Sequence, residues 1–213
     1  RKAYKGLMRF LIKTCGNVYL ACGLDAGNEL YGEEWFASHG EIIKNGIDIS
    51  KYAYSEDTAK RIKDEFDLTD RFVIGHIGHY VNVKNQAFLI QMMPDIIRQK
   101  PNAKLLMFGD GDDRAMLDAL IKQLHMEDHA RLMGNANNIH EVLSAFDVFA
   151  FPSLYEGTPL SLIEAQANGV PCLISDRIPN DACLTDLITK LPVDDAEIWI
   201  KSITGAQRKF NED

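Results

Sequence analysis

The chain has 213 residues, of which 46% are hydrophobic and 25% are charged. This is an ordinary globular composition, with enough apolar surface for one full core and a smaller appended piece. The formal net charge of −8 argues against general nucleic-acid binding, because that affinity comes mainly from Lys and Arg neutralising phosphates. No apolar stretch of the sequence approaches the roughly 18 residues that a membrane-spanning helix needs.

The first fifty residues predict the end of one α/β unit. A helix, a short strand, a helical turn and a second strand are expected at residues 1–13, 18–21, 25–31 and 41–43. Asn45-Gly46 is a strong turn signal. We therefore expect a domain boundary near residue 50.

Beyond a polar stretch at residues 52–57, strand-like and helix-like segments alternate. Strands are expected at residues 72–77, 104–108, 130–133, 148–151 and 171–174. Helices are expected at residues 84–98, 113–124, 139–145 and 159–168, with a closing helix at 196–207. Successive βα units with right-handed crossovers form a doubly wound parallel sheet, so the predicted fold class is α/β, Rossmann-like, over residues 51–213.

The four cysteines are Cys15, Cys22, Cys172 and Cys183, and they form neither a C-x-x-C pair nor a zinc-ligand spacing. Cys172 lies in an apolar run, which favours a reduced thiol in the core. A reducing, cytoplasmic compartment is therefore expected.

The most informative segment is residues 151–165, which starts where an apolar strand ends. Thr158 is a natural N-cap and Pro159 suits the first position of a helix, which Asn168-Gly169 would end. Gly157 has no side chain to block a ligand from the helix N-terminus. Because the free N–H groups of a helix start bind anions, a diphosphate would suit this position.

Two glutamates belong to this segment. Glu164 lies in an otherwise apolar helix, where its two oxygens could accept bonds from both hydroxyls of a ribose. Glu156 lies in the loop before the helix and could reach the sugar side of the phosphates. The simpler interpretation pairs Glu164 with a Lys or Arg and leaves Glu156 in solvent; the combination of strand, glycine, cap and paired glutamates favours the ligand site.

The glutamate pair resembles the hallmark motif of retaining glycosyltransferase family 4, which has the GT-B fold. Four further blocks agree in order and spacing: Asn45–Asp48 at the interdomain junction, Gly75–Gly78 with Lys84-Asn85, Leu105–Gly111, and Asp147–Phe149. The resemblance covers nearly all of the chain from about residue 40. It implies that residues 1–50 are a fragment of the N-terminal acceptor domain and that residues 51–213 are the C-terminal donor-binding domain.

The resemblance also implies roles for single residues. Glu156 is the expected catalytic residue, and Lys84 is expected to contact the diphosphate. The expected donor-binding residues are Gly78, His79, Lys84, Gly157, Thr158, Leu160, Ser161 and Glu164. Asn135 and Ala136 are expected to lie along the base, although a simple connecting loop accounts for them equally well.

Two features depart from, or compete with, this interpretation. Many relatives have Arg where this chain has His79, which donates one bond to a phosphate where Arg donates two. Arg177 is a candidate substitute and equally a plain surface residue. Asp110-Gly111-Asp112 fits a D-x-D metal pattern, but a turn after a strand explains these residues better.

The expected activity is transfer of a sugar from a nucleotide sugar, UDP-linked by the resemblance, to an acceptor hydroxyl with retention. No cofactor, metal or nucleic acid is expected. The acceptor, a glycan or lipid-linked glycan, would bind mainly to an N-terminal domain that is largely absent, so this chain alone should turn over little. A cytoplasmic enzyme, peripheral at the inner face of a membrane, would fit polysaccharide assembly. The alternatives are a nucleotide-sugar epimerase or phosphorylase of the same fold and a non-catalytic nucleotide-binding module.

Overall fold

The computed structural model describes residues 2–208, and the chain divides into two compact units, Arg1–Gly46 and Ile47–Asp213. The division falls directly after Gly46, inside the turn that the sequence indicates and a few residues before the expected boundary at residue 50. That the first unit belongs to an acceptor domain stays a prediction.

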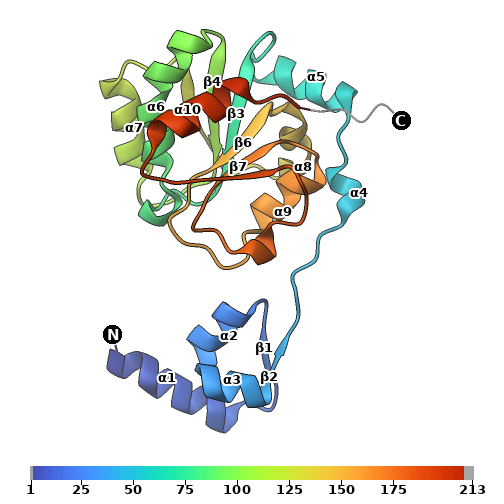
Figure 1. Ribbon diagram of the computed structural model, residues 1–213, viewed down its shortest axis with the longest axis vertical. Helices are drawn as coiled ribbons and strands as arrows, with labels where there is room; N and C mark the ends of the chain where they lie inside the picture. The colour runs from blue at the N-terminus through green and yellow to red at the C-terminus, as the bar shows by residue number, and fades with distance from the viewer. Residues whose placement is uncertain (1, 209–213) are drawn as a thin grey trace. The chain divides into compact units, whose positions relative to one another are not determined.

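Unit 1 contains three helices and two short strands among its described residues (Figure 1). They are α1 Lys2–Cys15, β1 Tyr19–Ala21, α2 Leu24–Tyr31, α3 Glu33–His39 and β2 Gly40–Ile42. The two strands pair in parallel, and Tyr19, Tyr31 and Phe36 form a small core. Large apolar side chains such as Phe10 and Val18 stay exposed, 64% and 70% respectively. The strands and the other two helices lie close to their expected positions, whereas α3 was not predicted.

Unit 2 is built on a six-stranded, wholly parallel sheet with the strand order β5-β4-β3-β6-β7-β8. The strands are β3 Phe72–Ile77, β4 Ala103–Phe108, β5 Ala130–Gly134, β6 Val148–Phe151, β7 Cys172–Ser175 and β8 Ile188–Leu191. The predicted doubly wound α/β sheet is therefore confirmed. The strand order reverses between β3 and β6, and ligands bind at this switch point in open α/β sheets.

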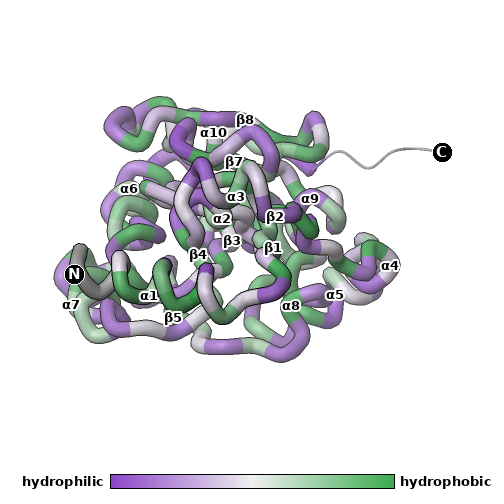
Figure 2. The backbone as a smooth tube through the Cα atoms, turned by 90° about the horizontal axis from the view of Figure 1, so that it is seen from below, coloured by the Kyte–Doolittle hydropathy of each residue, from purple (hydrophilic) through white to green (hydrophobic). Residues whose placement is uncertain are grey.

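Helices cover both faces of the sheet (Figure 2). One face carries α6 Gln86–Gln99, α7 Arg114–Gln123 and α10 Ala196–Gly205. The other face carries α5 Glu56–Glu65, α8 Ile139–Val142 with the 3-10 turn η2 Leu143–Ala145, and α9 Leu160–Ala167. Short helices α4 Ile49–Tyr52, η1 Asn82–Lys84 and η3 Asn180–Ala182 lie in the connections.

The strands divide their side chains between two cores, because successive residues of a strand point to opposite faces. Ile74 and Leu105 pack under α6, α7 and α10, whereas Val73 and Leu106 pack under the helices of the other face. Burial on both faces explains why these strands read as continuous apolar runs. Cys172 is one of the core residues, fully buried as a free thiol, and burial raises its pKa.

Several helix starts differ from the prediction. Helix α6 begins at Gln86, after the turn η1 and after Asn85, whose φ of 57° lies in the left-handed region. Lys84 is therefore not in the first turn of α6. Helix α9 begins at Leu160 with Pro159 at the N-cap position, so the expectation that Thr158 caps it was wrong.

Two elements were not predicted. Helix α5 begins after Ser55, whose hydroxyl accepts a bond from the Thr58 N–H at 3.2 Å. Strand β8 is an edge strand whose polar residues Thr189 and Lys190 interrupt the apolar run that marks the central strands. Among the described residues, no helix is long and apolar enough to cross a membrane.

His76, near the end of β3, is a fully buried titratable side chain. Its Nδ1 lies 2.9 Å from the Ala150 carbonyl oxygen, and since a carbonyl only accepts, Nδ1 carries the proton. Its Nε2 is buried without a described partner. Burial lowers the pKa of His76 to about 4, and the neighbouring Lys84 charge acts in the same direction.

This lowered pKa predicts an acid-sensitive stability. In the unfolded chain His76 binds a proton below its ordinary pKa of 6.5, whereas in the folded protein it stays neutral down to about pH 4. Stability should therefore fall as pH drops from 6.5 towards 4, by up to about 3 kcal/mol from this residue. His76→Asn keeps a donor near the position of Nδ1 and cannot titrate. Urea unfolding of both proteins between pH 7 and 4 checks this: the stability difference should shift in favour of the variant as pH falls, and a constant difference would contradict it.

Candidate functional site

The loops after β3, β4 and β5 are joined at the carboxyl edge of the sheet. The Gly78 N–H donates to the Phe108 carbonyl at 2.9 Å, and the Gly109 N–H donates to the Gly134 carbonyl at 2.9 Å. Gly109 has a φ of 138°, and a Cβ there would lie 2.1 Å from the Gly78 carbonyl oxygen. Only glycine permits so close an approach, which fixes the position of the loop that contains Gly78.

The loops after β3 and β6 meet at the switch point. The Leu154 N–H donates to the Val83 carbonyl at 2.8 Å, and Asn85 Nδ2 donates to the Pro152 carbonyl at 3.3 Å. The left-handed conformation of Asn85 turns the chain here so that Lys84 is outside the helix. These contacts place Lys84 against the loop that contains Glu156.

Lys84 and Glu156 form an ion pair, with Lys84 Nζ 2.5 Å from Glu156 Oε1. The side chains are only 17% and 10% exposed. The ammonium also lies 5.2 Å from the centre of the Phe151 ring, within the range of a cation–π contact. The expected diphosphate contact and the expected catalytic carboxylate are therefore adjacent, and Glu156 is not the solvated loop residue of the simpler interpretation.

The start of α9, four residues after Glu156, has backbone N–H groups without a described backbone acceptor. The first backbone bond of the helix runs from the Leu162 N–H to the Pro159 carbonyl at 3.1 Å, so the N–H groups of Leu160 and Ser161 precede it. Gly157 is exposed, and a Cβ there would meet nothing within 4 Å. Thr158 and Ser161 are half-buried and Leu160 is exposed. The donor-binding residues predicted on this segment thus lie around an open helix N-terminus.

Glu164, one turn further along α9, accepts a hydrogen bond from the Tyr52 hydroxyl at 2.7 Å. Both side chains are half-buried. Burial raises the pKa of Tyr52 to about 12, and the bond to Glu164 contributes to the rise. The described partner of Glu164 is therefore a neutral phenol, whereas the simpler interpretation expected a Lys or Arg.

His79 is exposed and makes one described hydrogen bond, from Nδ1 to the Asp110 carbonyl at 3.0 Å. Because a carbonyl can only accept, Nδ1 donates this bond. The sequence analysis expected His79 to donate one hydrogen bond to a phosphate. In the structure the Nδ1 group makes its hydrogen bond within the protein. Arg177, the candidate substitute, is exposed in the connection after β7.

Asn135 and Ala136 directly follow β5, two strands away from β3 at the same sheet edge. Asn135 is exposed, and Ala136 packs against the core cluster beneath α8 and α9. Asp110 bonds the N–H of Gly111 at 3.0 Å and lies 3.6 Å from Arg114, which accounts for it as a turn residue. Within residues 2–208, no three His, Cys, Asp or Glu side chains gather as a metal site would need.

Sequence reasoning missed three residues near this site. Tyr52 was placed in a polar stretch, and it is separated from Glu164 by 112 positions, so no local spacing relates them. His76 and Ser153 were read only as parts of motifs, yet both are fully buried and have polar atoms without a described partner. A polar residue at the end of an apolar strand was the available signal.

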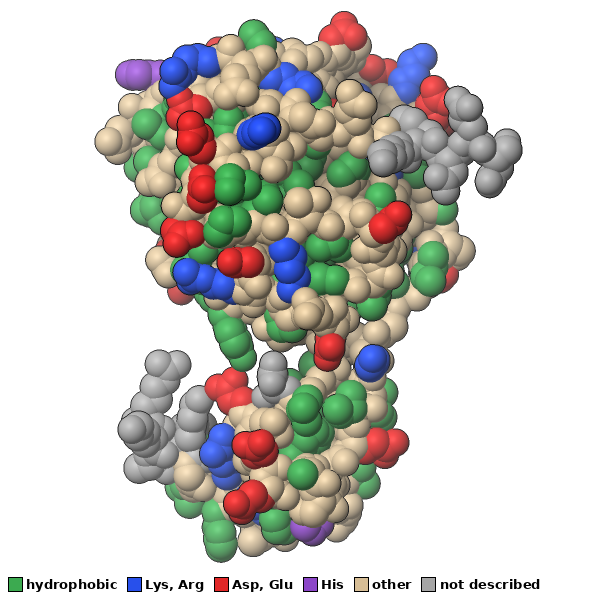
Figure 3. Space-filling view, viewed as in Figure 1, with side chains coloured by type: hydrophobic (Ala, Val, Ile, Leu, Met, Phe, Trp, Pro, Cys, Tyr) green, Lys and Arg blue, Asp and Glu red, His purple; other side chains and the backbone are tan. Residues whose placement is uncertain are grey.

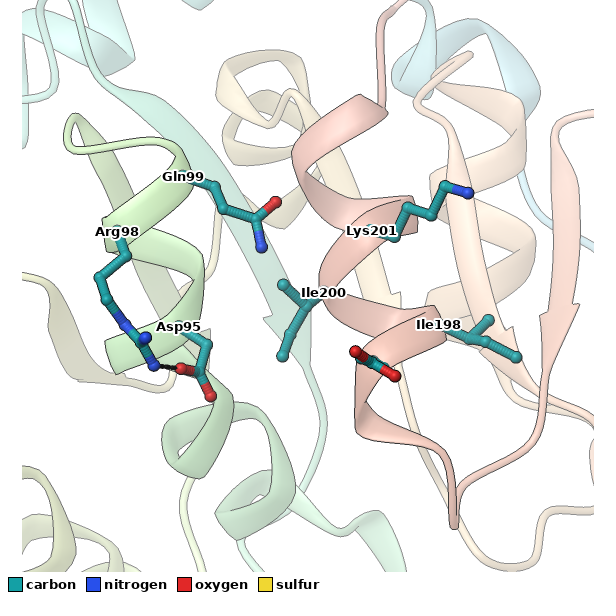
Figure 4. A pocket seen from close by; sticks show the side chains of 7 residues that line it. Asp95, Arg98, Gln99, Ile198, Ile200 and Lys201 are labelled. Atoms are coloured by element: carbon teal, nitrogen blue, oxygen red, sulfur yellow. Dashed lines mark ion pairs between the residues drawn. The ribbon is translucent and has the colours of Figure 1, made fainter.

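A separate groove of about 590 Å³ lies between α6 and α10 (Figure 4). Gln99 and Ile200 extend towards each other across it, and Asp95 pairs with Arg98 beside it. The last turn of α6 precedes β4, so this groove lies towards the amino edge of the sheet, away from Lys84. Basic and acidic side chains are interspersed on the face of unit 2 seen in Figure 3.

Comparison with solved structures agrees with the architecture. The structure resembles Anabaena HepE in complex with UDP and glucose with a TM-score of 0.80 at 18% identity, over 96% of this chain and 57% of that one. It also resembles a sucrose-phosphate synthase from Thermosynechococcus elongatus with a TM-score of 0.76 at 19% identity, over 95% and 52% of the two chains. At these identities the likeness shows a shared GT-B fold.

Comparison with sequences shows the family. The protein EpsF of Bacillus subtilis (strain 168), which is named as a glycosyltransferase, is 34% identical over 205 residues. These are 94% of this chain and 53% of EpsF. The UDP-Gal:alpha-D-GlcNAc-diphosphoundecaprenol alpha-1,3-galactosyltransferase of Escherichia coli is 31% identical over 147 residues, 67% of this chain and 38% of that enzyme. The chain thus spans about half the length of EpsF and less of the second relative. The family model of the glycosyl transferases group 1 matches residues 57–198, most of unit 2, and the chain belongs to this family.

Proposed function

We propose that this chain forms the donor-binding half of a retaining glycosyltransferase. The observation that carries the proposal is the ion pair of Lys84 with Glu156 at the switch point of the sheet, in the loop that leads into α9, with Glu164 on that helix. One structural neighbour and one relative support the ligand class, since HepE was solved with UDP and glucose and the Escherichia coli enzyme is named for a UDP-sugar donor. The donor is a nucleoside-diphosphate sugar, UDP-linked in our proposal.

In the proposed reaction, the bond between the anomeric carbon and the diphosphate oxygen breaks and both electrons leave with the nucleoside diphosphate. The acceptor hydroxyl bonds to the same face of that carbon, and its proton offsets charge on the departing phosphate. Lys84 and the N–H groups at the start of α9 would stabilise the charge that develops there. Glu156 lies in the loop before α9 and pairs with Lys84, which would contact the diphosphate. In this arrangement Glu156 would lie beside the sugar.

Unit 1 would be part of the acceptor domain, and the acceptor would be a glycan or a lipid-linked glycan. The exposed apolar side chains of unit 1 support a larger domain, because exposed apolar surface often marks a contact with another part of a protein. The name of the Escherichia coli relative contains a lipid-linked sugar acceptor. We also propose a cytoplasmic location and a role in polysaccharide or glycoconjugate assembly; the four free cysteines support a reducing compartment.

The two glutamates should respond differently to substitution. Glu164→Gln removes a charged acceptor for the ribose hydroxyls and should weaken UDP binding about ten- to hundredfold, or roughly 1.5–3 kcal/mol. Glu156→Gln breaks the ion pair and leaves Lys84 free for the phosphates, so UDP affinity should stay the same or rise slightly. Calorimetry on this chain measures both, and turnover of an enzyme that carries both domains should fall with Glu156→Gln. Equal losses of UDP affinity in the two variants would refute this division of roles.

Donor binding should also be independent of divalent metal. Lys84 and the helix N-terminus supply the positive charge that a metal ion would otherwise bring to the diphosphate. UDP titrations with magnesium, with manganese and with a chelator should give the same Kd. Asp112→Asn serves as a matched variant and should leave the Kd unchanged. A strict metal requirement would contradict this prediction, and loss of the metal-dependent UDP binding in Asp112→Asn would establish Asp110 and Asp112 as a metal site.

A further inference from the structure

Tyr52 is attached at two points, to Glu164 within α9 and to Asn168 directly after the helix. Its hydroxyl donates to Glu164 Oε1 at 2.7 Å, and its backbone carbonyl accepts a bond from Asn168 Nδ2 at 2.8 Å. Glu164 and Asn168 are four residues apart and so lie on the same side of the helix, one turn from each other. Tyr52 therefore spans one turn of α9, with the backbone fixed at one end and the hydroxyl at the other.

The backbone attachment is firm because Asn168 is itself held by several groups. Asn168 is 1% exposed, donates to Ser144 Oγ at 3.1 Å and accepts bonds from Arg208. Arg208 also donates to the carbonyls of Leu143 and Phe146. A buried polar group with all its partners in place resists movement. The position of the Tyr52 ring is thus set by the core of unit 2.

The Tyr52 hydroxyl can orient the Glu164 carboxylate and still leave acceptor positions free on it. With its raised pKa of about 12, Tyr52 is a neutral donor at physiological pH. A carboxylate offers about four acceptor positions on its two oxygens, and Tyr52 uses one of them. The remaining positions are enough for the two hydroxyls of a ribose. Without the phenol, the carboxylate could rotate among several orientations.

We propose that Tyr52 is a positioning residue that orients the Glu164 carboxylate towards the ribose diol and so sets the preference for ribonucleotides over 2′-deoxyribonucleotides. This inference rests on the proposed function, in which Glu164 binds the ribose. Tyr52 touches the carboxylate and acts on the donor through it. The opposite possibility is that the phenol occupies the place of a ribose hydroxyl and competes with the donor, and it predicts the opposite sign of the effect.

The test compares UDP and 2′-deoxy-UDP by calorimetry on the wild-type chain and on Tyr52→Phe. Phenylalanine keeps the ring and the backbone carbonyl and removes only the hydroxyl. UDP binding should weaken about three- to tenfold, while binding of 2′-deoxy-UDP should change much less, so that the ribose preference falls. Tyr54→Phe is the matched control, since it removes a hydroxyl two residues away in the same segment, and it should leave the ribose preference unchanged.

The same comparison in the Glu164→Gln variant shows whether Tyr52 acts through the carboxylate. In that variant, adding Tyr52→Phe should change the UDP affinity little. Tighter UDP binding by Tyr52→Phe would show competition and overturn the proposal. Equal weakening of both nucleotides would show a general structural role and overturn it as well. If the wild-type chain bound neither UDP nor ADP nor GDP, the proposed function itself would fail. If the chain bound UDP but Tyr52→Phe left the ribose preference unchanged, only the inference about Tyr52 would fail.

Discussion

The pairing of β3 with β6 is the constraint on which the site depends. These strands are neighbours in the sheet although two strands and their helices separate them in the chain. Because the strands are parallel, the loops that follow them leave the same edge, and two hydrogen bonds join these loops at 2.8 and 3.3 Å. This is how Lys84 and Glu156, 72 residues apart in sequence, form one ion pair.

The ion pair also explains how the site tolerates its own charges. A lone carboxylate or ammonium that is mostly withdrawn from water is costly, and the two charges offset this cost for each other. A diphosphate that enters the site would offer Lys84 a new anionic partner and free Glu156 to face the sugar. In the proposed reaction, the exchange of partners would keep the charge balanced while the bond to the leaving group lengthens.

Much of the fold could be predicted because each central strand is buried on both faces and its sequence is a continuous apolar run. The strands Phe72–Ile77 and Val148–Phe151 were predicted with their observed bounds. The prediction of the helix start at Lys84 was wrong because apolar spacing does not show that Asn85 adopts a left-handed conformation. For the candidate site, the motifs singled out Glu156 and Lys84, whose roles stay a prediction, but did not indicate that the two side chains are partners. The bond from Tyr52 to Glu164 depends on tertiary packing across 112 residues, which no local pattern encodes.

Helix α9 connects these observations, because two polar residues in its second half and Asn168 directly after it bond to four separate segments. Glu164 bonds Tyr52 of α4, and Asn168 bonds Ser144 and Arg208. Gln166, 4% exposed, bonds the residue 182–185 segment through the Ala182 carbonyl and the Leu184 and Thr185 N–H groups. A helix is stiff along its axis, so fixing one half also fixes the direction in which its first N–H groups point. The direction of the N–H groups that we propose for phosphate binding is therefore determined by side chains that lie further along the helix.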